Sequence, residues 1–217
     1  MATKKTPDEY GLLKSMILRG EVMPNERLVE ADYALRLGTN RANIRKALAR
    51  LEQDGLVVSE PFKGTHVRRI TEAEAIEIFQ VRGALEAMMV PFTVEKMTAA
   101  HRVTLKALAQ HMRVALSHDD ALAVGRASRA VREQMWQISE HSTGTRVLSM
   151  LNSQLVRVWF QAIMMPGRAS SIVSELEAVV DAVVAGSTDA AVSAIRKYHE
   201  SSITALKKAI ANRSASG

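Results

Sequence analysis

The sequence has 217 residues and contains no cysteine, which excludes disulfide bonds and thiolate metal sites. This composition is compatible with a reducing cytoplasm. No apolar run reaches the ~18 residues that a membrane-spanning helix needs. The first residues, MATKKTPDEYG, lack the apolar core of a signal peptide. We therefore expect a soluble cytoplasmic protein that has no membrane partner.

The sequence also lacks the motifs of common enzyme sites. It has no nucleophile elbow, P-loop, glycine-rich dinucleotide turn or pair of catalytic carboxylates. These absences disfavour an enzyme, including an enzyme fused to a binding domain.

The positive charge of the chain is greatest in its N-terminal part. The whole chain has a net charge of +6 and a pI near 9.8, which favours a polyanionic partner. Residues 1–70 contain thirteen Lys or Arg and nine Asp or Glu, a net charge of +4. Residues 71–217 contain sixteen and fourteen, a net charge of +2. We therefore expect the N-terminal part to face nucleic acid.

Two short helices joined by a tight turn are predicted in the region from residue 27 to residue 54. The first helix ends at Gly38, since glycine adopts the positive φ of a sharp turn at no steric cost. Asn40 can cap the second helix by accepting a hydrogen bond from the backbone near Asn43. Apolar residues of the second helix follow the i, i+3, i+4, i+7 spacing of one buried stripe: Ile44, Ala47, Leu48 and Leu51.

A basic β-hairpin is predicted after these helices. Residues 56–58 and 66–68 are typical of two short strands, joined through Pro61, Lys63 and Gly64. Two helices at a tight turn followed by such a hairpin predict a winged helix-turn-helix. A helix about 10 Å across fits the major groove of DNA, and its N-terminus adds positive potential.

The residue types at the start of the second helix suit base contacts. Arginine can bond guanine bidentately, and asparagine has a matching donor and acceptor for adenine. The alternative is a helical hairpin with a solvated basic face, and we favour DNA binding because the predicted hairpin is basic as well. The predicted DNA-contacting residues are Asn40, Arg41, Asn43, Arg45, Lys46, Lys63 and Gly64.

Motifs with a defined spacing run from residue 17 to residue 64. They are Ile17-Leu18-Arg19-Gly20, Pro24, Leu28-Val29-Glu30, Leu37-Gly38, Arg41, Ile44-Arg45, Ala47-Leu48, Leu51, Gly55-Leu56-Val57 and Gly64. They resemble the N-terminal domain of the GntR family of bacterial transcription regulators. Val81-Arg82 with Leu85-Glu86 is similar to the opening helix of the FCD-type effector domain of the FadR subfamily. The resemblance implies a homodimeric repressor or activator whose DNA affinity is set by a small molecule.

The sequence departs from the family pattern at four positions of the DNA-binding domain. Asn25 replaces a glycine, Asn40 replaces a serine cap, and Lys46 replaces a glutamate. Ala31 stands where FadR-like regulators have a further arginine. We therefore expect an operator that differs from the FadR operator.

Two domains are predicted, a winged helix-turn-helix over residues 1–70 and an all-α domain over residues 71–217. Thr71 and Glu74 have the form of a capping box, so the linker is very short. From residue 71 onward the pattern is helical, with Gly and Pro rare. We expect an antiparallel bundle of six helices that begin near residues 72, 99, 117, 143, 171 and 187. The fold class is therefore mainly α.

The resemblance implies a divalent metal site in many FCD-type domains. Its four ligand positions fall here on Val131, Met135, Leu176 and His199, of which only His199 offers a nitrogen or oxygen donor. A protein metal site normally needs three protein ligands. We therefore predict that this chain binds no metal and needs no cofactor.

An effector pocket is predicted inside the helical domain, lined by Arg82, Gln134, Met135, Asn152, Trp159 and His199. Alternatives remain for three of them: an internal Arg82–Glu86 pair, a hydrogen-bonded core histidine at His199, and ordinary packing of Met135. Without a metal the effector is either an organic acid held by Arg82 or His199, or a more apolar metabolite. The alternative function is a constitutive DNA-binding protein whose helical domain only dimerises.

Overall fold

A computed structural model describes residues 8–215, except for the side chains of residues 156–161 and 213–215. The fold is mainly α, with a single two-stranded antiparallel sheet among the described residues. The chain forms two compact units. One contains the described residues up to Thr71 together with Met150–Val156, and the other contains Glu72–Ser149 and the residues from Arg157 onward. That residues 1–70 and 71–217 are the two domains stays a prediction.

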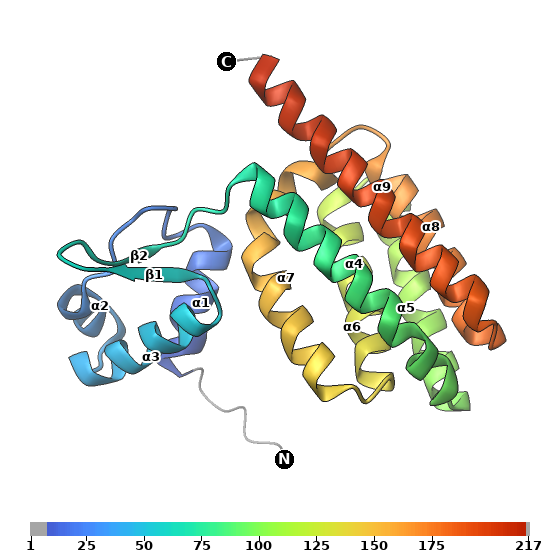
Figure 1. Ribbon diagram of the computed structural model, residues 1–217, viewed down its shortest axis with the longest axis horizontal. Coiled ribbons are helices and arrows are strands. Elements are labelled where there is room, and N and C mark those ends of the chain that lie inside the picture. The colour runs from blue at the N-terminus through green and yellow to red at the C-terminus, as the bar shows by residue number, and fades with distance from the viewer. Residues whose placement is uncertain (1–7, 216–217) are drawn as a thin grey trace. The chain divides into compact units, whose positions relative to one another are not determined.

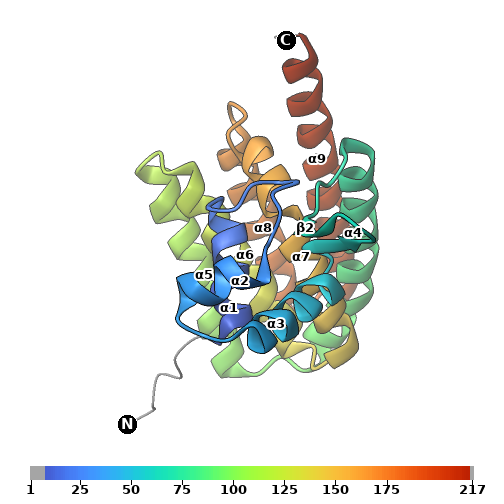
Figure 2. The ribbon, with the colours of Figure 1, turned by 90° about the vertical axis from the view of Figure 1, so that its left-hand side faces the viewer.

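The first unit is a winged helix-turn-helix, as the sequence predicts. Its elements are α1 (Glu9–Arg19), α2 (Glu30–Leu37), α3 (Arg41–Gln53), β1 (Val57–Glu60) and β2 (Gly64–Val67) (Figure 1). Helix α3 packs against both α1 and α2, which are grouped with it in Figure 2. The core that joins them contains the predicted stripe of α3 and fully buried residues of α1 and the hairpin, among them Leu13, Val57 and Val67.

The turn between α2 and α3 confirms the predicted capping. Gly38 has a φ of 64° and ends α2 in the left-handed conformation. The side-chain oxygen of Asn40 accepts a hydrogen bond of 2.9 Å from the backbone N–H of Asn43. Because this bond satisfies one of the free N–H groups at the helix start, the first turn of α3 is fixed in place.

The hairpin is longer toward its tip than the sequence predicts. Val57 pairs with Val67 and Glu60 pairs with Gly64, so only residues 61–63 form the loop. The predicted strand limits, 56–58 and 66–68, were therefore wrong by one or two residues at each end. Pro61 lies just outside the ladder, where its missing N–H is not needed.

The second unit is a helical bundle. Its helices are α4 (Glu72–Glu95), α5 (Ala99–Ser117), α6 (Ala121–Ile138), α7 (Ser142–Ile163), α8 (Arg168–Ala185) and α9 (Thr188–Ala215), although Met150–Val156 of α7 is grouped with the first unit. The six predicted helices are confirmed to within a few residues. Helix α9 packs against both α4 and α8, and α5 packs against α6 and α8 (Figure 1). Among the residues described, no helix is long and apolar enough to cross a membrane.

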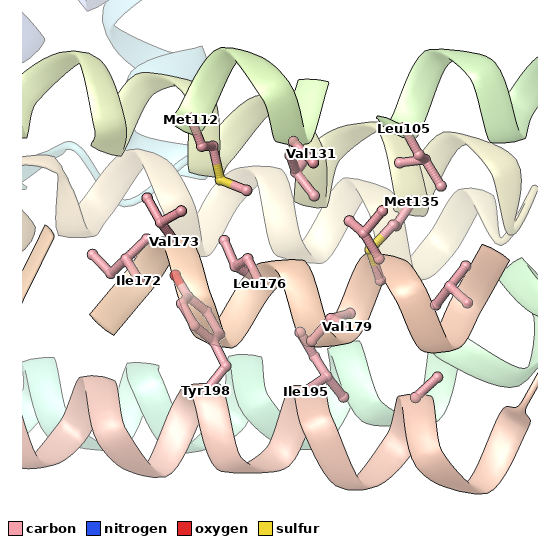
Figure 3. Close-up of a cluster of buried hydrophobic side chains, with 14 of the residues drawn as sticks. Leu105, Met112, Val131, Met135, Ile172, Val173, Leu176, Val179, Ile195 and Tyr198 are labelled. Carbon is pink, nitrogen blue, oxygen red and sulfur yellow. The ribbon is translucent and has the colours of Figure 1, made fainter. Parts of the chain in front are cut away.

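The bundle core contains three of the four positions at which the family resemblance implies metal ligands. Val131 and Leu176 are fully buried and Met135 is 3% exposed. All three point into one cluster with Leu105, Met112, Val179 and Ile195 (Figure 3). Tight packing of apolar side chains therefore occupies this part of the bundle.

Candidate DNA-binding surface and buried charge cluster

The start of α3 presents two basic side chains that form no hydrogen bond or ion pair with any described residue. Arg41 is the first residue of α3, and Lys46 lies just over one turn later; both are exposed. Their charges lie near the helix N-terminus, where the helix dipole adds to the positive potential. This end of the helix is therefore suited to a polyanion.

Arg45 is held by an intramolecular ion pair. Its Nε and Nη2 donate to the two carboxylate oxygens of Glu30 at 2.8 and 2.7 Å. Arg45 is still 72% exposed, and its hydrogen bond lowers the pKa of Glu30. The bidentate geometry is the one that arginine uses for guanine, so Arg45 must release Glu30 before it bonds a base in this way.

Asn43 is engaged inside the unit. Its side-chain nitrogen donates to Glu9 Oε1 and to Thr39 Oγ1, each at 3.1 Å. Thr39 also donates to Glu9 at 2.6 Å. In this conformation Asn43 ties α3 to α1, and a bidentate contact to adenine, which needs one N–H donor, would require at least one of its two donor bonds to break.

The hairpin tip carries a basic side chain that is held by an ion pair. Lys63 Nζ lies 2.6 Å from Glu60 Oε2, and the lysine is 73% exposed. Gly64 has a φ of 77°, and a Cβ atom there would lie 3.1 Å from Nε of Arg27. Glycine is therefore required at this position by conformation and by the close approach of Arg27, which adds a further positive charge to the hairpin.

The bundle contains a cluster of buried charged groups from three helices. Glu86 on α4 accepts from Arg82 Nη2 at 3.3 Å and from Arg132 Nη1 on α6 at 3.1 Å. His199 Nε2 on α9 lies 3.2 Å from the other carboxylate oxygen of Glu86. All four side chains are at most 3% exposed. The sequence predicts the Arg82–Glu86 pair as one alternative, but it does not predict that Arg132 and His199 join it.

The pKa values indicate that the cluster carries one net positive charge. Burial acts to raise the pKa of Glu86, but Arg132 and the other neighbours hold it well below its ordinary value. Burial, with Arg132 nearby, lowers the pKa of Arg82 to about 10. Burial also lowers the pKa of His199. Two guanidinium groups, one carboxylate and a neutral imidazole therefore coexist at neutral pH.

Several polar atoms of this cluster lack hydrogen bonds to the described residues. They are Arg82 Nε, Arg132 Nε, Glu86 Oε2 and both ring nitrogens of His199. The contact between His199 and Glu86 is close in distance but does not have the geometry of a hydrogen bond. Buried polar atoms are normally hydrogen-bonded. These unbonded atoms are therefore candidates for contact with a bound molecule.

A groove lies between α4 and α9 next to the cluster. Its volume is about 360 Å³, and its residues are Phe79, Gln80, Gly83, Ala84, Ala87, Arg196, His199, Glu200 and Ile203. A Cβ atom on Gly83 would lie 3.0 Å from the Cβ of His199, so glycine permits the two helices to approach here. His199 therefore lines the groove and also contacts Glu86.

The structure brings only part of the predicted effector pocket together. Arg82 and His199 meet at Glu86, whereas Met135 belongs to the apolar core and Gln134 is half-buried on α6. Asn152 is buried, but it lies in the segment that is grouped with the first unit. The side chain of Trp159 lies outside the described residues.

The donors do not fit the metal that the resemblance implies. Val131, Met135 and Leu176 are packed in the core, and His199 is the single donor among the four positions. Within the described part of the chain, no group of three or more His, Cys, Asp or Glu residues is placed to hold a metal ion. The absence of a bound metal stays a prediction, and elemental analysis of protein purified without a metal-binding tag would test it.

Comparisons with known proteins agree with this architecture. Residues 9–67 match the family of bacterial regulatory proteins called gntR, and residues 77–201 match the FCD domain. This chain belongs to the GntR family of transcription regulators and carries an FCD domain. It is a GntR-family DNA-binding transcription regulator.

Similar sequences carry regulator names as well. The HTH-type transcriptional regulator Rv0494 of Mycobacterium tuberculosis is 27% identical over 93% of this chain and 87% of its own length. The HTH-type transcriptional repressor GlaR of Escherichia coli is 34% identical over 41% of this chain. The chain spans about two-fifths of the length of GlaR and of YdhC from Bacillus subtilis, which is 33% identical.

Solved structures share the fold. McbR/YncC of E. coli superposes with a TM-score of 0.77 at 19% identity, over 92% of this chain and 95% of that one. A GntR regulator of Rhodococcus sp. RHA1 gives 0.73 at 21% identity, over the same fractions. At these identities the likeness concerns the fold alone.

The cluster predicts a large loss of stability for Glu86→Ala. Two buried guanidinium groups would lose their shared carboxylate, and breaking such a pair costs about 3–5 kcal/mol of unfolding free energy. Chemical denaturation monitored by circular dichroism measures this. The matched control is Glu140→Ala, since Glu140 is 71% exposed and pairs with Lys96 on the surface. A Glu86→Ala protein as stable as the control would contradict the cluster's structural role.

Proposed function

We propose that the protein is a homodimeric repressor that binds a pseudo-palindromic operator. Its affinity for this DNA changes when a small molecule binds the helical domain. The observation that carries the proposal is the exposed Arg41 at the capped start of α3, in the same unit as the basic hairpin. Repression, as opposed to activation, is supported by the printed name of GlaR. In vitro transcription from the bound promoter tests that choice.

The residues predicted to contact DNA divide into those for bases, those for phosphates, and two asparagines that support the helix start. Arg41 and Arg45 are proposed to contact bases, because they lie on the first turns of the helix that enters the major groove. Lys63 and Gly64 on the hairpin, with Lys46 on α3, are proposed to contact phosphates, which position the protein but carry no sequence information. Asn40 and Asn43 support the helix start through the hydrogen bonds described above.

Arg41→Ala should lower affinity for a duplex selected from a random pool by about tenfold or more, with little effect on unrelated DNA. Lys63→Ala should instead weaken binding to all duplexes and reduce the salt slope by about 1. Fluorescence anisotropy at several salt concentrations distinguishes the two effects. Equal losses on selected and unrelated duplexes for Arg41→Ala would mean that Arg41 only positions the protein.

The effector is proposed to bind in the groove between α4 and α9. Its walls are mostly apolar, with Phe79, Ala84, Ala87 and Ile203, and the buried ring of His199 offers polar atoms without a partner among the described residues. The charges at the rim are those of Arg196 and Glu200. This combination favours a small, largely apolar metabolite with one hydrogen-bonding group.

Ala84→Trp should abolish the response to the effector without unfolding the protein. Ala84 is exposed and lines the groove, so an indole there fills the space. Thermal shift against a metabolite library identifies binders of the wild-type protein, and their effect on DNA affinity is then measured. Ala100→Trp, at an exposed position of α5, is the control. If no metabolite shifts the wild type, the constitutive alternative is favoured; if Ala84→Trp responds normally, the effector binds elsewhere.

Dimerisation is proposed to use an exposed apolar stripe of α4. Val81, Met88 and Phe92 are 53, 42 and 38% exposed, and Leu85 lies half-buried between them. These residues follow an i, i+4, i+7, i+11 spacing, which gives one face of a helix suited to pairing with its own copy. A second copy is the favoured occupant because two DNA-binding domains are needed to bind two half-sites.

Val81→Glu should convert the dimer to a monomer, because a carboxylate would be buried against its symmetry-related copy. Light scattering of the full chain at micromolar concentration measures the change. Val103→Glu is the control, since Val103 is 70% exposed on α5. A wild-type protein that is monomeric, or a Val81→Glu protein that stays dimeric, would remove this stripe from the proposal.

A further inference from the structure

The tip of the hairpin carries a fully exposed aromatic side chain. Phe62 has a relative exposure of 106%, so nothing in the described structure covers it. Its φ is 65°, a left-handed conformation that costs a non-glycine residue energy and that glycine or asparagine would adopt more readily. Both the exposure and the conformation oppose folding stability. Such outliers persist where they serve a function.

The loop that presents Phe62 is held in one shape. The backbone N–H of Lys63 donates to the carbonyl of Glu60 at 3.2 Å, and the two side chains form the ion pair described above. One residue pair below, the hydroxyls of Ser59 and Thr65 are 3.0 Å apart. Pro61 has a fixed φ, so the residue before Phe62 is stiff as well. The aromatic ring therefore projects from a preorganised tip.

The charge around the tip favours DNA as the partner of this ring. Lys63 follows Phe62 in the sequence. The guanidinium of Arg27 lies next to Gly64, the first residue of β2. An apolar side chain next to these cations, of which Lys63 is paired with Glu60, suits a groove edged by two rows of phosphates. Proteins that kink DNA insert phenylalanine or another apolar residue between base steps from the minor groove.

We propose, as an inference that rests on the operator binding proposed above, that Phe62 is a wedge that enters the minor groove and partly unstacks one base step in each half-site. This adds to the base contacts of α3 a preference for steps that unstack easily, such as TA and CA. Phe62 is thus a specificity-determining residue that acts through DNA deformation. Direct hydrogen bonds to bases play no part in its contribution.

Four variants of the full chain separate this role from a structural one. Phe62→Gly and Phe62→Asn remove the ring and suit the left-handed backbone, so both should fold at least as stably as the wild type. Phe62→Leu keeps an apolar wedge. Val103→Ala, at an exposed position of α5, controls for loss of surface apolar area.

The probe is a duplex selected from a random pool by the wild-type protein, with 2-aminopurine placed at successive positions. Wild type, Phe62→Leu and Val103→Ala should raise the fluorescence at one step in each half-site, which reports unstacking. Phe62→Gly and Phe62→Asn should lose this signal and bind about tenfold more weakly, since stacking on an aromatic ring is worth this much. Their salt slope should be unchanged, because no phosphate contact is lost.

Three results would overturn the proposal. One is a wild-type complex that binds the selected duplex tightly with no fluorescence rise at any step, which would leave DNA binding intact and exclude the wedge. Another is a Phe62→Gly protein with wild-type affinity and signal. The third is a change in the oligomeric state of Phe62→Gly without DNA, which would assign the ring to a protein interface.

Discussion

The carboxylate of Glu86 is the interaction on which the bundle depends. It contacts groups from α4, α6 and α9, and it is the sole acidic partner of Arg82 and Arg132 among the described residues. A buried charge without a partner costs several kcal/mol, so the three helices must keep the spacing that lets the carboxylate reach both arginines. Apolar packing alone would tolerate small shifts of α9 along α4. The charged cluster does not tolerate them, and Gly83 allows the close approach that it needs.

The surplus positive charge of the cluster also bears on the effector response proposed above. A cluster of two arginines and one carboxylate is stable only while the surrounding dipoles and Glu86 compensate the second guanidinium. A ligand group that bonds His199 changes the environment of Glu86 directly, since the imidazole and the carboxylate are 3.2 Å apart. If the effector binds as proposed above, stability and ligand recognition are coupled through His199, and its substitution is expected to affect both.

The DNA-binding unit shows the opposite use of charge. Its ion pairs lie on the surface, where each contributes little to stability and exchanges readily with water or phosphate. The pair of Glu30 with Arg45 and that of Glu60 with Lys63 compete with DNA for the same basic side chains. The two glutamates therefore reduce attraction to unrelated DNA. These ion pairs therefore favour selectivity between DNA sequences more than high affinity for DNA.

Sequence reasoning succeeded where the cause of a structure is local. Gly38 and Asn40 act within one turn of themselves, and the apolar stripe of α3 depends only on its own periodicity, so the helix-turn-helix was predictable. It failed where partners are distant in the chain. Arg45 meets Glu30 fifteen residues away, and Asn43 meets Glu9 thirty-four residues away, with no pattern that links them.

Arg132 illustrates an intermediate case. It lies one turn after Ser128, at the edge of the apolar stripe of α6, but the surrounding Arg126, Arg129 and Glu133 make this stretch resemble a solvated face. Its place one turn after the buried Ser128 is the signal that the sequence offers. The burial of Arg132 at 3% exposure follows from a carboxylate on another helix, which only the tertiary structure supplies.

Helix α4 connects these features by its position in the chain. It carries one wall of the groove, Arg82 and Glu86 of the cluster, and the exposed stripe of Val81, Met88 and Phe92. Only residues 68–71 separate its first residue from the end of β2. Four residues span at most about 14 Å, so a displacement of α4 cannot be absorbed by a long flexible linker. In the function proposed above, an effector that binds one placement of α4 more tightly than another shifts the population of DNA-competent dimers by that difference in affinity. A roughly hundredfold preference, about 2.7 kcal/mol, is enough to change a tenfold excess of one state into a tenfold excess of the other.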